Sequence, residues 1–471
     1  MEVDKKLSTQ EKALQINLRK DVYGSFAEVG GGQEVAANFF KVGGASGTVA
    51  KTMSAYDMKF SDAIYGQCDR YVSQNRLMSM LTHEYQLLPE RLPHRIETTR
   101  FFAFADTVET LNFSRTNQGQ GWMGIRFQTK PQGQYNDCVI HVKLLENDPL
   151  QQQYSLGILG VNLLYGCMFI DEPEEFMLSL LDGLTNRRIE IDMFRLEGPN
   201  LKFVDNRLMA LKLVKNGLTK AAMFGPDGNV LQPAEYLYKK NVLVLRGRFR
   251  PVTHVNVDML LTSRRHFLEE QDVDRNKMVT VSELTLNDLS PDGNIDEKDF
   301  LNRADIICSL GQNVLVSNYF EYYRLVDYLS TITKGRKTGL VMGIYALQKI
   351  FDEKTYENIH GGILECFASL FGTNVKLYIY PALRKDNSLF TLKDFETELP
   401  DNLKNLFRYL MDNNKMEDID EANVRNLHII SDNVLAMIKN HETGWEKFVP
   451  HKVEEAIKEH GLFDYSLPKV V

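Results

Sequence analysis

The feature that most constrains the fold of this chain is the alternation of short β-rich runs with amphipathic helical segments after about residue 100. Several runs, such as residues 242–245 and 339–344, are almost entirely apolar, which is typical of parallel strands buried on both faces. Helical periodicity separates them, as in residues 319–331 and 356–371. Strands that alternate with helices predict βα units and a mainly parallel sheet, so we expect an α/β protein.

The number of these units leaves the topology open. The repeats between residues 123 and 344 number about eight, which would suit a (β/α)8 barrel, but an open doubly wound sheet or two smaller sheets are alternatives. Residues 1–100 are rich in glycine and largely helical in pattern, and residues 386–471 are helical and charged. The predicted organisation is an α/β core over residues 101–385 with helical N- and C-terminal appendages.

The composition argues against several classes of protein. The net charge of the 471-residue chain is −8, which disfavours a global attraction to nucleic acid or to an anionic membrane. Five cysteines without a CxxC pattern disfavour a disulfide framework or cysteine-bound zinc. No apolar stretch is long enough to span a bilayer, and the first residues lack the pattern of a secretory signal. We therefore expect a cytoplasmic protein that binds neither nucleic acid nor membrane.

The strongest candidate for chemistry is the arginine-rich segment 246–254. An apolar strand pattern runs into a glycine, and three arginines surround the turn before a helical pattern begins near residue 256. A tight turn, fixed cations and the free N–H groups of a helix N-terminus are the parts of a phosphate site. The alternative is a loop whose arginines pair with carboxylates elsewhere. The residues expected to contact phosphate are Arg246, Gly247, Arg248, Arg250, Thr253 and His254.

Residues 247–253 read Gly-x-Phe-x-Pro-x-Thr. This pattern resembles the opening of the GxFxPx(H/T)xGH motif of nicotinate- and nicotinamide-mononucleotide adenylyltransferases. In that family the turn follows the first strand, and the closing residues of the motif contact the phosphates of ATP. The family's final Gly-His falls on Val255 and Asn256 here. The chain is also similar to an uncharacterised bacterial family that often carries the same adenylyltransferase label, and the resemblance implies nucleotidyl transfer.

Charged residues inside predicted strands form a second set of candidates. In residues 139–143 a histidine and a lysine share one face, and in residues 189–193 two carboxylates do. Near carboxyl strand ends, such groups would converge on the active-site face of an α/β fold. We expect His141, Glu190, Asp192 and Glu283 as catalytic groups, Glu190 and Asp192 as ligands of Mg²⁺, and Arg126 and Lys143 as phosphate contacts. The alternative is a satisfied ion-pair network or an edge strand whose charged face meets water.

Two further segments match motifs in part. Residues 45–52 have the spacing of a phosphate-binding P-loop in which alanines replace both glycines, and residues 101–106 form an apolar run that ends in Asp106. Residues 288–299 follow the EF-hand pattern, including Gly293, but have Asp299 in place of the usual glutamate. Turns and helix caps explain both segments as well.

Two functions follow from the sequence. The first is the binding or conversion of a phosphorylated small molecule or nucleotide, in nucleotidyltransferase fashion and with Mg²⁺. The second is a non-catalytic assembly protein, whose C-terminal helices and aromatic segments would form subunit contacts. We expect a homo-oligomer.

Overall fold

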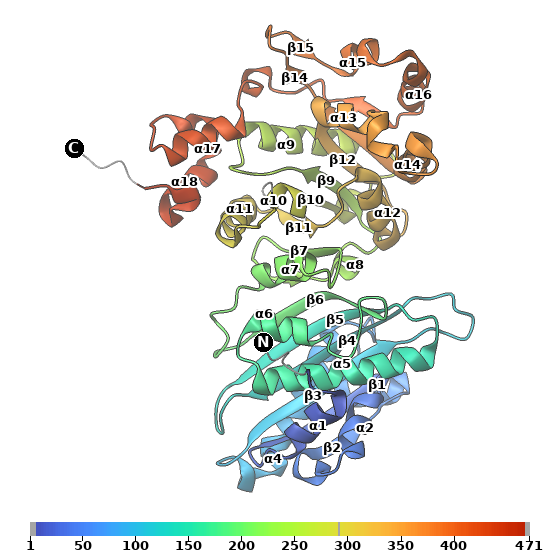
Figure 1. Cartoon of the computed structure of the whole chain (residues 1–471), viewed down its shortest axis with the longest axis vertical. Coiled ribbons are helices and arrows are strands. Elements are labelled where there is room, and N and C mark those ends of the chain that lie inside the picture. The colour runs from blue at the N-terminus through green and yellow to red at the C-terminus, as the bar shows by residue number, and fades with distance from the viewer. Residues whose placement is uncertain (1–5, 291–292, 467–471) are drawn as a thin grey trace, which may run out of the picture. The chain divides into compact units, whose positions relative to one another are not determined.

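The computed structural model describes residues 6–290 and 293–466, and it divides into two compact units, Met1–Lys220 and Ala221–Val471 (Figure 1). Unit 1 contains a six-stranded sheet and unit 2 an eight-stranded sheet. The alternation of strands and helices and the parallel pairing predicted from the sequence are confirmed. The strands form open sheets rather than a (β/α)8 barrel, and the division at residue 220 falls inside the segment expected as one core.

The sheet of unit 1 is mixed, with the order β2-β1-β3-β4-β5-β6. β1 runs parallel to β2 and β3, whereas β3 to β6 pair antiparallel in sequence order because only short loops join β3 to β4 and β4 to β5. The strands are β1 (Val22–Gly30), β2 (Val49–Met53), β3 (Arg100–Glu109), β4 (Gly119–Gln128), β5 (Tyr135–Leu144) and β6 (Ile189–Glu197). The helices are α1 (Thr9–Asn17), α2 (Glu34–Lys41), α3 (Met58–Tyr65), α4 (Gln74–Arg91), α5 (Pro149–Phe169), α6 (Pro173–Ser179) and α7 (Asn206–Lys215).

The core of unit 1 lies between its sheet and the layer formed by α1, α2 and α5, while α4 contacts β1, β3 and β4 (Figure 1). The ring of Phe26 packs against those of Phe102 and Phe104 at centroid distances of 5.6 and 5.8 Å, in the same core as the buried leucines of α5. The apolar stretch that the sequence shows at residues 156–170 is therefore most of α5, a core helix. Among the described residues, no helix has the length and apolar character needed to cross a membrane.

The sheet of unit 2 is parallel over six strands, in the order β16-β13-β12-β9-β10-β11, and continues into the antiparallel β7 and β8. Its strands are β7 (Ala221–Phe224), β8 (Val230–Leu231), β9 (Asn241–Arg246), β10 (Met278–Thr285), β11 (Asn313–Ser317), β12 (Thr338–Gly343), β13 (Val375–Tyr380) and β16 (Met416–Asp418); β14 (Ala382–Leu383) and β15 (Leu389–Phe390) form a separate pair. Numbered along the chain, the parallel strands stand in the order 3-2-1-4-5-6, the doubly wound order of dinucleotide-binding sheets.

Helices cover both faces of this sheet. α12, α13 and α14 join β11, β12 and β13 over one face, and their apolar side chains form a core with those of β9, β12 and β13. α9 and α11 link β9, β10 and β11 (Figure 1). The helices are α8 (Pro233–Tyr236), α9 (His254–Glu269), α10 (Leu286–Leu289), α11 (Glu297–Ser309), α12 (Tyr322–Thr333), α13 (Ile344–Ile350), α14 (Gly362–Phe371), α15 (Leu392–Glu398), α16 (Asp401–Asp412), α17 (Ser431–Lys439) and α18 (His451–His460). The strand order reverses between β9 and β12, which is where open α/β sheets bind their ligands.

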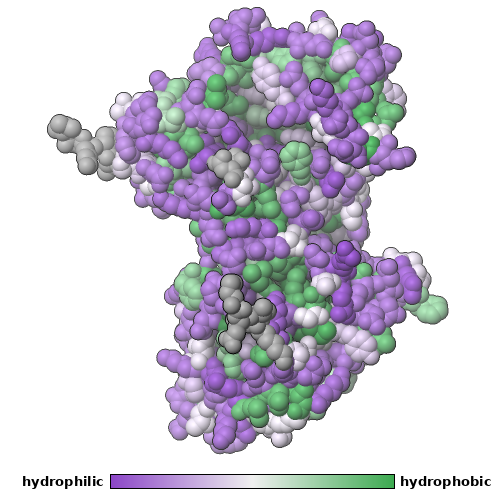
Figure 2. All heavy atoms as spheres, in the orientation of Figure 1, coloured by the Kyte–Doolittle hydropathy of each residue, from purple (hydrophilic) through white to green (hydrophobic). Residues whose placement is uncertain are grey.

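Hydrophilic residues dominate the face of the molecule seen in Figure 2, and apolar residues gather there only in small patches. Some large apolar side chains are nevertheless well exposed in unit 1, among them Phe40, Tyr56, Met58 and Phe60. Tyr56 and Met58 line a cavity at the carboxyl ends of β1 and β3. These two exposed side chains therefore form part of the wall of that cavity.

Candidate functional site

The turn between β9 and α9 contains the motif that resembles the adenylyltransferases. It leaves the first parallel strand of unit 2 at Arg246 and enters the helix at His254. A Cβ on Gly247 would lie 3.3 Å from a ring atom of Phe249, so glycine allows the aromatic ring to pack close to the backbone. Phe249 has a left-handed backbone (φ 48°) and a buried ring. Burial of this ring anchors the turn to the protein core.

Two hydrogen bonds from Thr253 to the side chain of Asn256 close the first turn of α9. Oδ1 of Asn256 accepts a hydrogen bond from the backbone N–H of Thr253 at 2.9 Å and one from its hydroxyl at 3.2 Å. These two residues stand at the family's His/Thr position and at its final histidine. Both therefore serve as helix caps here, while His254 is half-buried at the first helical position.

The side chain of Arg246 is mostly buried and forms its hydrogen bonds within the protein. Its Nε and Nη2 donate to the two carboxylate oxygens of Glu283 at 2.8 and 3.0 Å, and its Nη groups also donate to the carbonyls of Tyr319 and Phe320. The guanidinium lies 4.3 Å from the ring centroid of Tyr322. Burial lowers the pKa of Arg246, but the attraction of Glu283 outweighs it and leaves the pKa above its ordinary value. Arg246 and Glu283 therefore join the ends of β9 and β10.

Arg250 and Arg303 share the carboxylate of Asp299. Arg250 Nε donates to Oδ1 of Asp299 and Arg303 Nε donates to Oδ2, both at 2.7 Å. Arg303 also donates to the carbonyl oxygens of Arg248 and Asp288 at 3.1 Å. This buried arginine thus holds the backbone of the motif turn and of the segment after β10.

Arg248 is the most exposed of the three arginines of the turn. Its Nη2 lies 2.5 Å from Oδ2 of Asp432 in the first turn of α17, and both side chains remain more than half exposed. The partners of Arg246 and Arg250 are mostly or wholly buried, with side-chain exposures of 0% for Glu283 and 10% for Asp299. Arg248 is therefore the arginine best placed to meet a ligand.

A cavity of 370 Å³ lies beside this turn, at the carboxyl ends of the parallel strands. The segments after β9, β10, β11 and β12 all contribute to its wall, with Gly247, Asn287, Tyr322 and Lys349 as examples. Burial raises the pKa of Tyr322 to about 12 against the opposing effect of Arg246, so its hydroxyl stays protonated at neutral pH. The cavity lining combines the cations Arg246, Arg248 and Lys349 with an aromatic wall from α12 and α14, and it also contains the carboxylates of Asp288, Glu321 and Asp352.

The structure brings together four predicted residues in unit 1. His141 Nδ1 lies 2.5 Å from Asp192 Oδ1, and Lys143 Nζ lies 3.1 Å from Glu190 and 3.3 Å from Asp192. The hydroxyl of Thr219 donates to Glu190 at 2.6 Å. β5 and β6 are antiparallel, so these side chains meet across neighbouring strands rather than at a shared carboxyl edge. Each charged group has a partner of opposite charge, which is the ion-pair alternative considered from the sequence.

Arg126 belongs to a separate pair on the same sheet. It donates from Nε and Nη2 to the two oxygens of Asp137, each at 2.8 Å, and its guanidinium lies 4.1 Å from the ring centroid of Tyr135. The predicted residues therefore fall into two groups, one in each unit. Unit 1 contains Arg126, His141, Lys143, Glu190 and Asp192, and unit 2 contains Arg246, Gly247, Arg248, Arg250, Thr253, His254 and Glu283.

Metal-binding groups are sparse. Within residues 6–290 and 293–466, no three His, Cys, Asp or Glu side chains gather in a way that could hold a metal ion. Part of the candidate calcium loop, residues 291–292, lies outside the described residues, and Asp296 of that loop caps α11. Lys51 of the P-loop-like segment lies inside β2 and pairs with Glu84 at 2.6 Å. That segment runs from a short turn into a strand, so it does not form the strand–loop–helix of a P-loop.

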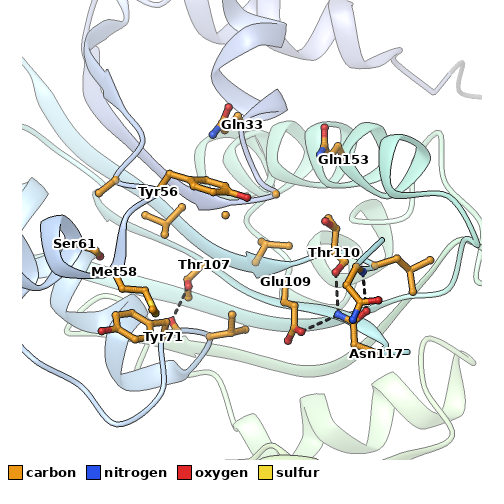
Figure 3. Close-up of a pocket in the computed structure, with 18 residues that line it drawn as sticks. Gln33, Tyr56, Met58, Ser61, Tyr71, Thr107, Glu109, Thr110, Asn117 and Gln153 are labelled. Carbon is orange, nitrogen blue, oxygen red and sulfur yellow. Dashed lines mark hydrogen bonds between the residues drawn. The ribbon is translucent and has the colours of Figure 1, made fainter. Parts of the chain in front are cut away.

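A second cavity, of 510 Å³, lies in unit 1 at the carboxyl ends of β1 and β3 (Figure 3). Its wall includes Tyr56, Thr107 and Gln153, and a hydrogen-bonded group in which Asn117 Nδ2 donates to Glu109 at 2.8 Å. Of the described residues that line it, none is Lys, Arg or His. Hydroxyl and amide groups suit a neutral polar ligand more than a phosphate.

Two buried carboxyl groups lie next to each other in unit 1. Glu28 of β1 and Asp106 of β3 are register partners, and their exposures are 2% and 0%. Glu28 accepts the backbone N–H groups of Val35 and Ala36 in α2 at 2.8 and 3.2 Å. Burial raises the pKa of Glu28 to about 7, and burial with the charge of Glu28 raises that of Asp106 well above its ordinary value.

Sequence reasoning did not find Asp299, Arg303 or Asp432 as parts of the site. Asp299 was read as a calcium ligand, and Asp432 lies 184 residues from its partner Arg248. The turn after β9 gave the local signal, but the carboxylates that pair with its arginines come from distant segments. Only the folded sheet brings them together.

No protein-family model matches the sequence, and no curated protein matches it either. Among solved structures, a competence/damage inducible protein CihA from Agrobacterium tumefaciens is similar at 15% identity and a TM-score of 0.24, covering 34% of this chain and 96% of that one. A competence-damaged protein (CinA) superfamily protein from Enterobacter cloacae is similar at 10% identity and a TM-score of 0.24, covering 35% of this chain and 96% of that one. Likenesses this weak have no bearing on function.

Proposed function

We propose that unit 2 binds a nucleotide or another phosphorylated small molecule at the carboxyl edge of its parallel sheet. The supporting observation is one of position. The Gly-x-Phe-x-Pro-x-Thr turn follows β9, the first strand of a sheet ordered 3-2-1-4-5-6, and a cavity lies beside it at the reversal of strand order. Doubly wound sheets bind ligands at this place, with phosphates near the turn that follows the first strand.

Phosphate recognition would depend on Arg248, which lines the cavity, whereas none of the described residues of α9 lines it. A guanidinium donates paired hydrogen bonds to phosphate oxygens. Arg246 and Arg250 hold the turn against the protein interior, since they pair with Glu283 and Asp299, which are wholly and mostly buried. In this proposal they position the turn, and Arg248 contacts the ligand.

The resemblance to adenylyltransferases implies nucleotidyl transfer as the reaction class. A phosphate oxygen of one substrate would attack the α-phosphorus of a nucleoside triphosphate, and pyrophosphate would leave. Mg²⁺ binds such substrates through their phosphates and one or two carboxylates, and Asp288 and Asp352 line the cavity. Asn256 stands where the family has histidine, and an amide does not carry the charge of an imidazolium. Ligand binding therefore has stronger support than catalysis.

The cavity of unit 1 is the competing location. It is larger than that of unit 2, at 510 against 370 Å³, but its described lining has no cationic side chain. A phosphate ester placed there would lose water without gaining a compensating charge. The lining of the unit 2 cavity contains three carboxylates but also three cationic side chains, and the presence of these cations favours unit 2 for a phosphorylated ligand.

Thermal unfolding with ATP, nicotinate mononucleotide and sugar phosphates, each with and without Mg²⁺, tests this proposal. A ligand at a hundred times its Kd stabilises the folded state by about 2.7 kcal/mol. For a unit of this size that is a rise in Tm of roughly 5–10 °C. We expect at least one phosphorylated ligand to produce such a shift, and Arg248→Ala to remove most of it.

Arg265→Ala is the matched control, because Arg265 is also half-exposed and forms a 2.5 Å ion pair, with Glu421. This variant should keep the ligand-induced shift. The proposal fails if no phosphorylated compound shifts the transition, or if Arg248→Ala binds as tightly as the parent protein.

A further inference from the structure

The three arginines of the turn after β9 differ in how freely each could change its partner. Side-chain exposures are 9% and 0% for Arg246 and Glu283, and 30% and 10% for Arg250 and Asp299. Arg248 and Asp432 are 54% and 56% exposed. Separating a buried pair leaves an uncompensated charge in the interior, whereas water can solvate both members of an exposed pair. Only the Arg248–Asp432 pair can open without disturbing the core.

The carboxylate of Asp432 binds the guanidinium of Arg248, to which a phosphate would also bind. Its Oδ2 lies 2.5 Å from Nη2 of Arg248. Arg248 lines the cavity at the reversal of strand order. A phosphate bound there would compete for the same guanidinium and would be repelled by the nearby carboxylate.

The carboxylate comes from a different part of the chain. Asp432 lies in the first turn of α17, and it does not cap that helix, because Ile430 is the residue at the N-cap. A negative charge in a first helical turn stabilises the helix only modestly. Replacing the carboxylate by an amide should therefore leave α17 folded.

We infer that Asp432 is an affinity-determining residue of the proposed phosphate site: its carboxylate occupies Arg248 in the free protein and is exchanged for a phosphate group when ligand binds. This inference rests on the proposed function of unit 2. A dianionic phosphate attracts the guanidinium more strongly than one carboxylate does, so the exchange favours phosphate esters over carboxylate ligands. Exposed ion pairs bias an equilibrium by at most about fivefold, so the exchange is reversible.

The test measures the Kd of inorganic pyrophosphate and of ATP by calorimetry for the full chain at low ionic strength. We expect Asp432→Asn to bind both ligands about two- to fivefold more tightly than the parent protein. Asp432→Ser should behave in the same way, which separates loss of the charge from any effect of the new side chain. The advantage should disappear at high salt, because exposed charges are screened.

Glu421→Gln is the matched control. Glu421 pairs with Arg265 at the same 2.5 Å separation, and both side chains are about half exposed. This variant should bind the two ligands as the parent does. In an Arg248→Ala background, Asp432→Asn should give a smaller gain, because the exchange at Arg248 is lost and only the removal of the repelling carboxylate remains.

The possible outcomes distinguish a failure of this inference from a failure of the proposed function of unit 2. If Arg248→Ala weakens binding but Asp432→Asn binds no better than the parent, the exchange is wrong and the phosphate site stands. Weaker binding by Asp432→Asn would mean that the carboxylate orients Arg248 for the ligand, which also overturns the inference. If neither pyrophosphate nor ATP binds to the parent or to any variant, this inference falls, and the proposed function falls with it only if nicotinate mononucleotide and the sugar phosphates do not bind either.

Discussion

The buried pair formed by Glu28 and Asp106 should make unit 1 less stable as the pH rises from acid to neutral. Both side chains are almost wholly buried on adjacent parallel strands. Neither oxygen of Asp106 has a hydrogen-bond partner of ordinary geometry among the described residues. Two such carboxyl groups cannot both ionise without leaving uncompensated charge in the interior.

The sign follows from the pKa of Glu28, which burial raises from 4.5 to about 7. The unfolded chain releases this proton near pH 4.5, while the folded protein holds it until about pH 7. Between these values the folded state binds more protons, so the free energy of unfolding falls as the pH rises, and the raised pKa of Asp106 adds to this fall. One proton held over this interval corresponds to a loss of about 3 kcal/mol.

Asp106→Asn isolates this effect. The amide removes one ionisable group and lets Glu28 ionise beside a neutral donor. We expect the variant to gain about 1–3 kcal/mol of unfolding free energy relative to the parent at pH 8, and little at pH 5. Chemical denaturation at several pH values gives the free energies, and hydrogen exchange of peptides from β1 and β3 assigns the change to unit 1.

Asp69→Asn is the control, since Asp69 is an exposed acid of the same unit. Its pH profile should follow that of the parent protein. The reasoning is refuted if the stability of unit 1 does not fall relative to Asp106→Asn between pH 5 and 8, or if that variant loses stability equally at both values.

Two further substitutions test the packing around the two cavities. Glu283→Ala should destabilise unit 2 by about 3–5 kcal/mol in chemical denaturation, because it leaves the buried Arg246 unpaired; a loss under 1 kcal/mol would contradict this. Gly32→Ala places a Cβ 2.1 Å from Oδ1 of Asp106, so it should lower the stability of unit 1 by roughly 1–3 kcal/mol and its Tm accordingly. An unchanged Tm would mean that the glycine-rich turn can move away from Asp106.

The strands of unit 2 were predictable because their signal is local. β9 and β12 are buried on both faces, so nearly every residue is apolar whatever its neighbours are. β1 was not anticipated, although it lies at the centre of its parallel group between β2 and β3. It contains Gly24 and Ser25, which weaken the hydrophobic pattern. A Cβ on Gly24 would lie 2.2 Å from the carbonyl oxygen of Phe102, so the close packing of β1 against β3 requires glycine at this position. The same glycine weakens the hydrophobic pattern by which the strand could be predicted.

The candidate site was predictable only in its local part. The turn at residues 247–253 is continuous in the sequence, so its glycine, arginines and following helix could be read together. The partners of those arginines could not, because Glu283 is 37 residues and Asp432 184 residues away from the arginine that each one binds. Which arginine is buried depends on strand order and register. The sequence contains no direct measure of either.

The two cavities occupy comparable places, each beside a glycine-containing turn that joins a parallel strand to a helix. In unit 1 the turn joins β1 to α2, and in unit 2 it joins β9 to α9. The buried acid of β1 beside the first turn, Glu28, accepts backbone N–H groups of the following helix α2, whereas the second turn contains three arginines. Similar local topology thus creates two cavities that differ in their lining, since only the described lining of the second contains cationic side chains, and these side chains rather than the fold favour a phosphate beside Arg248.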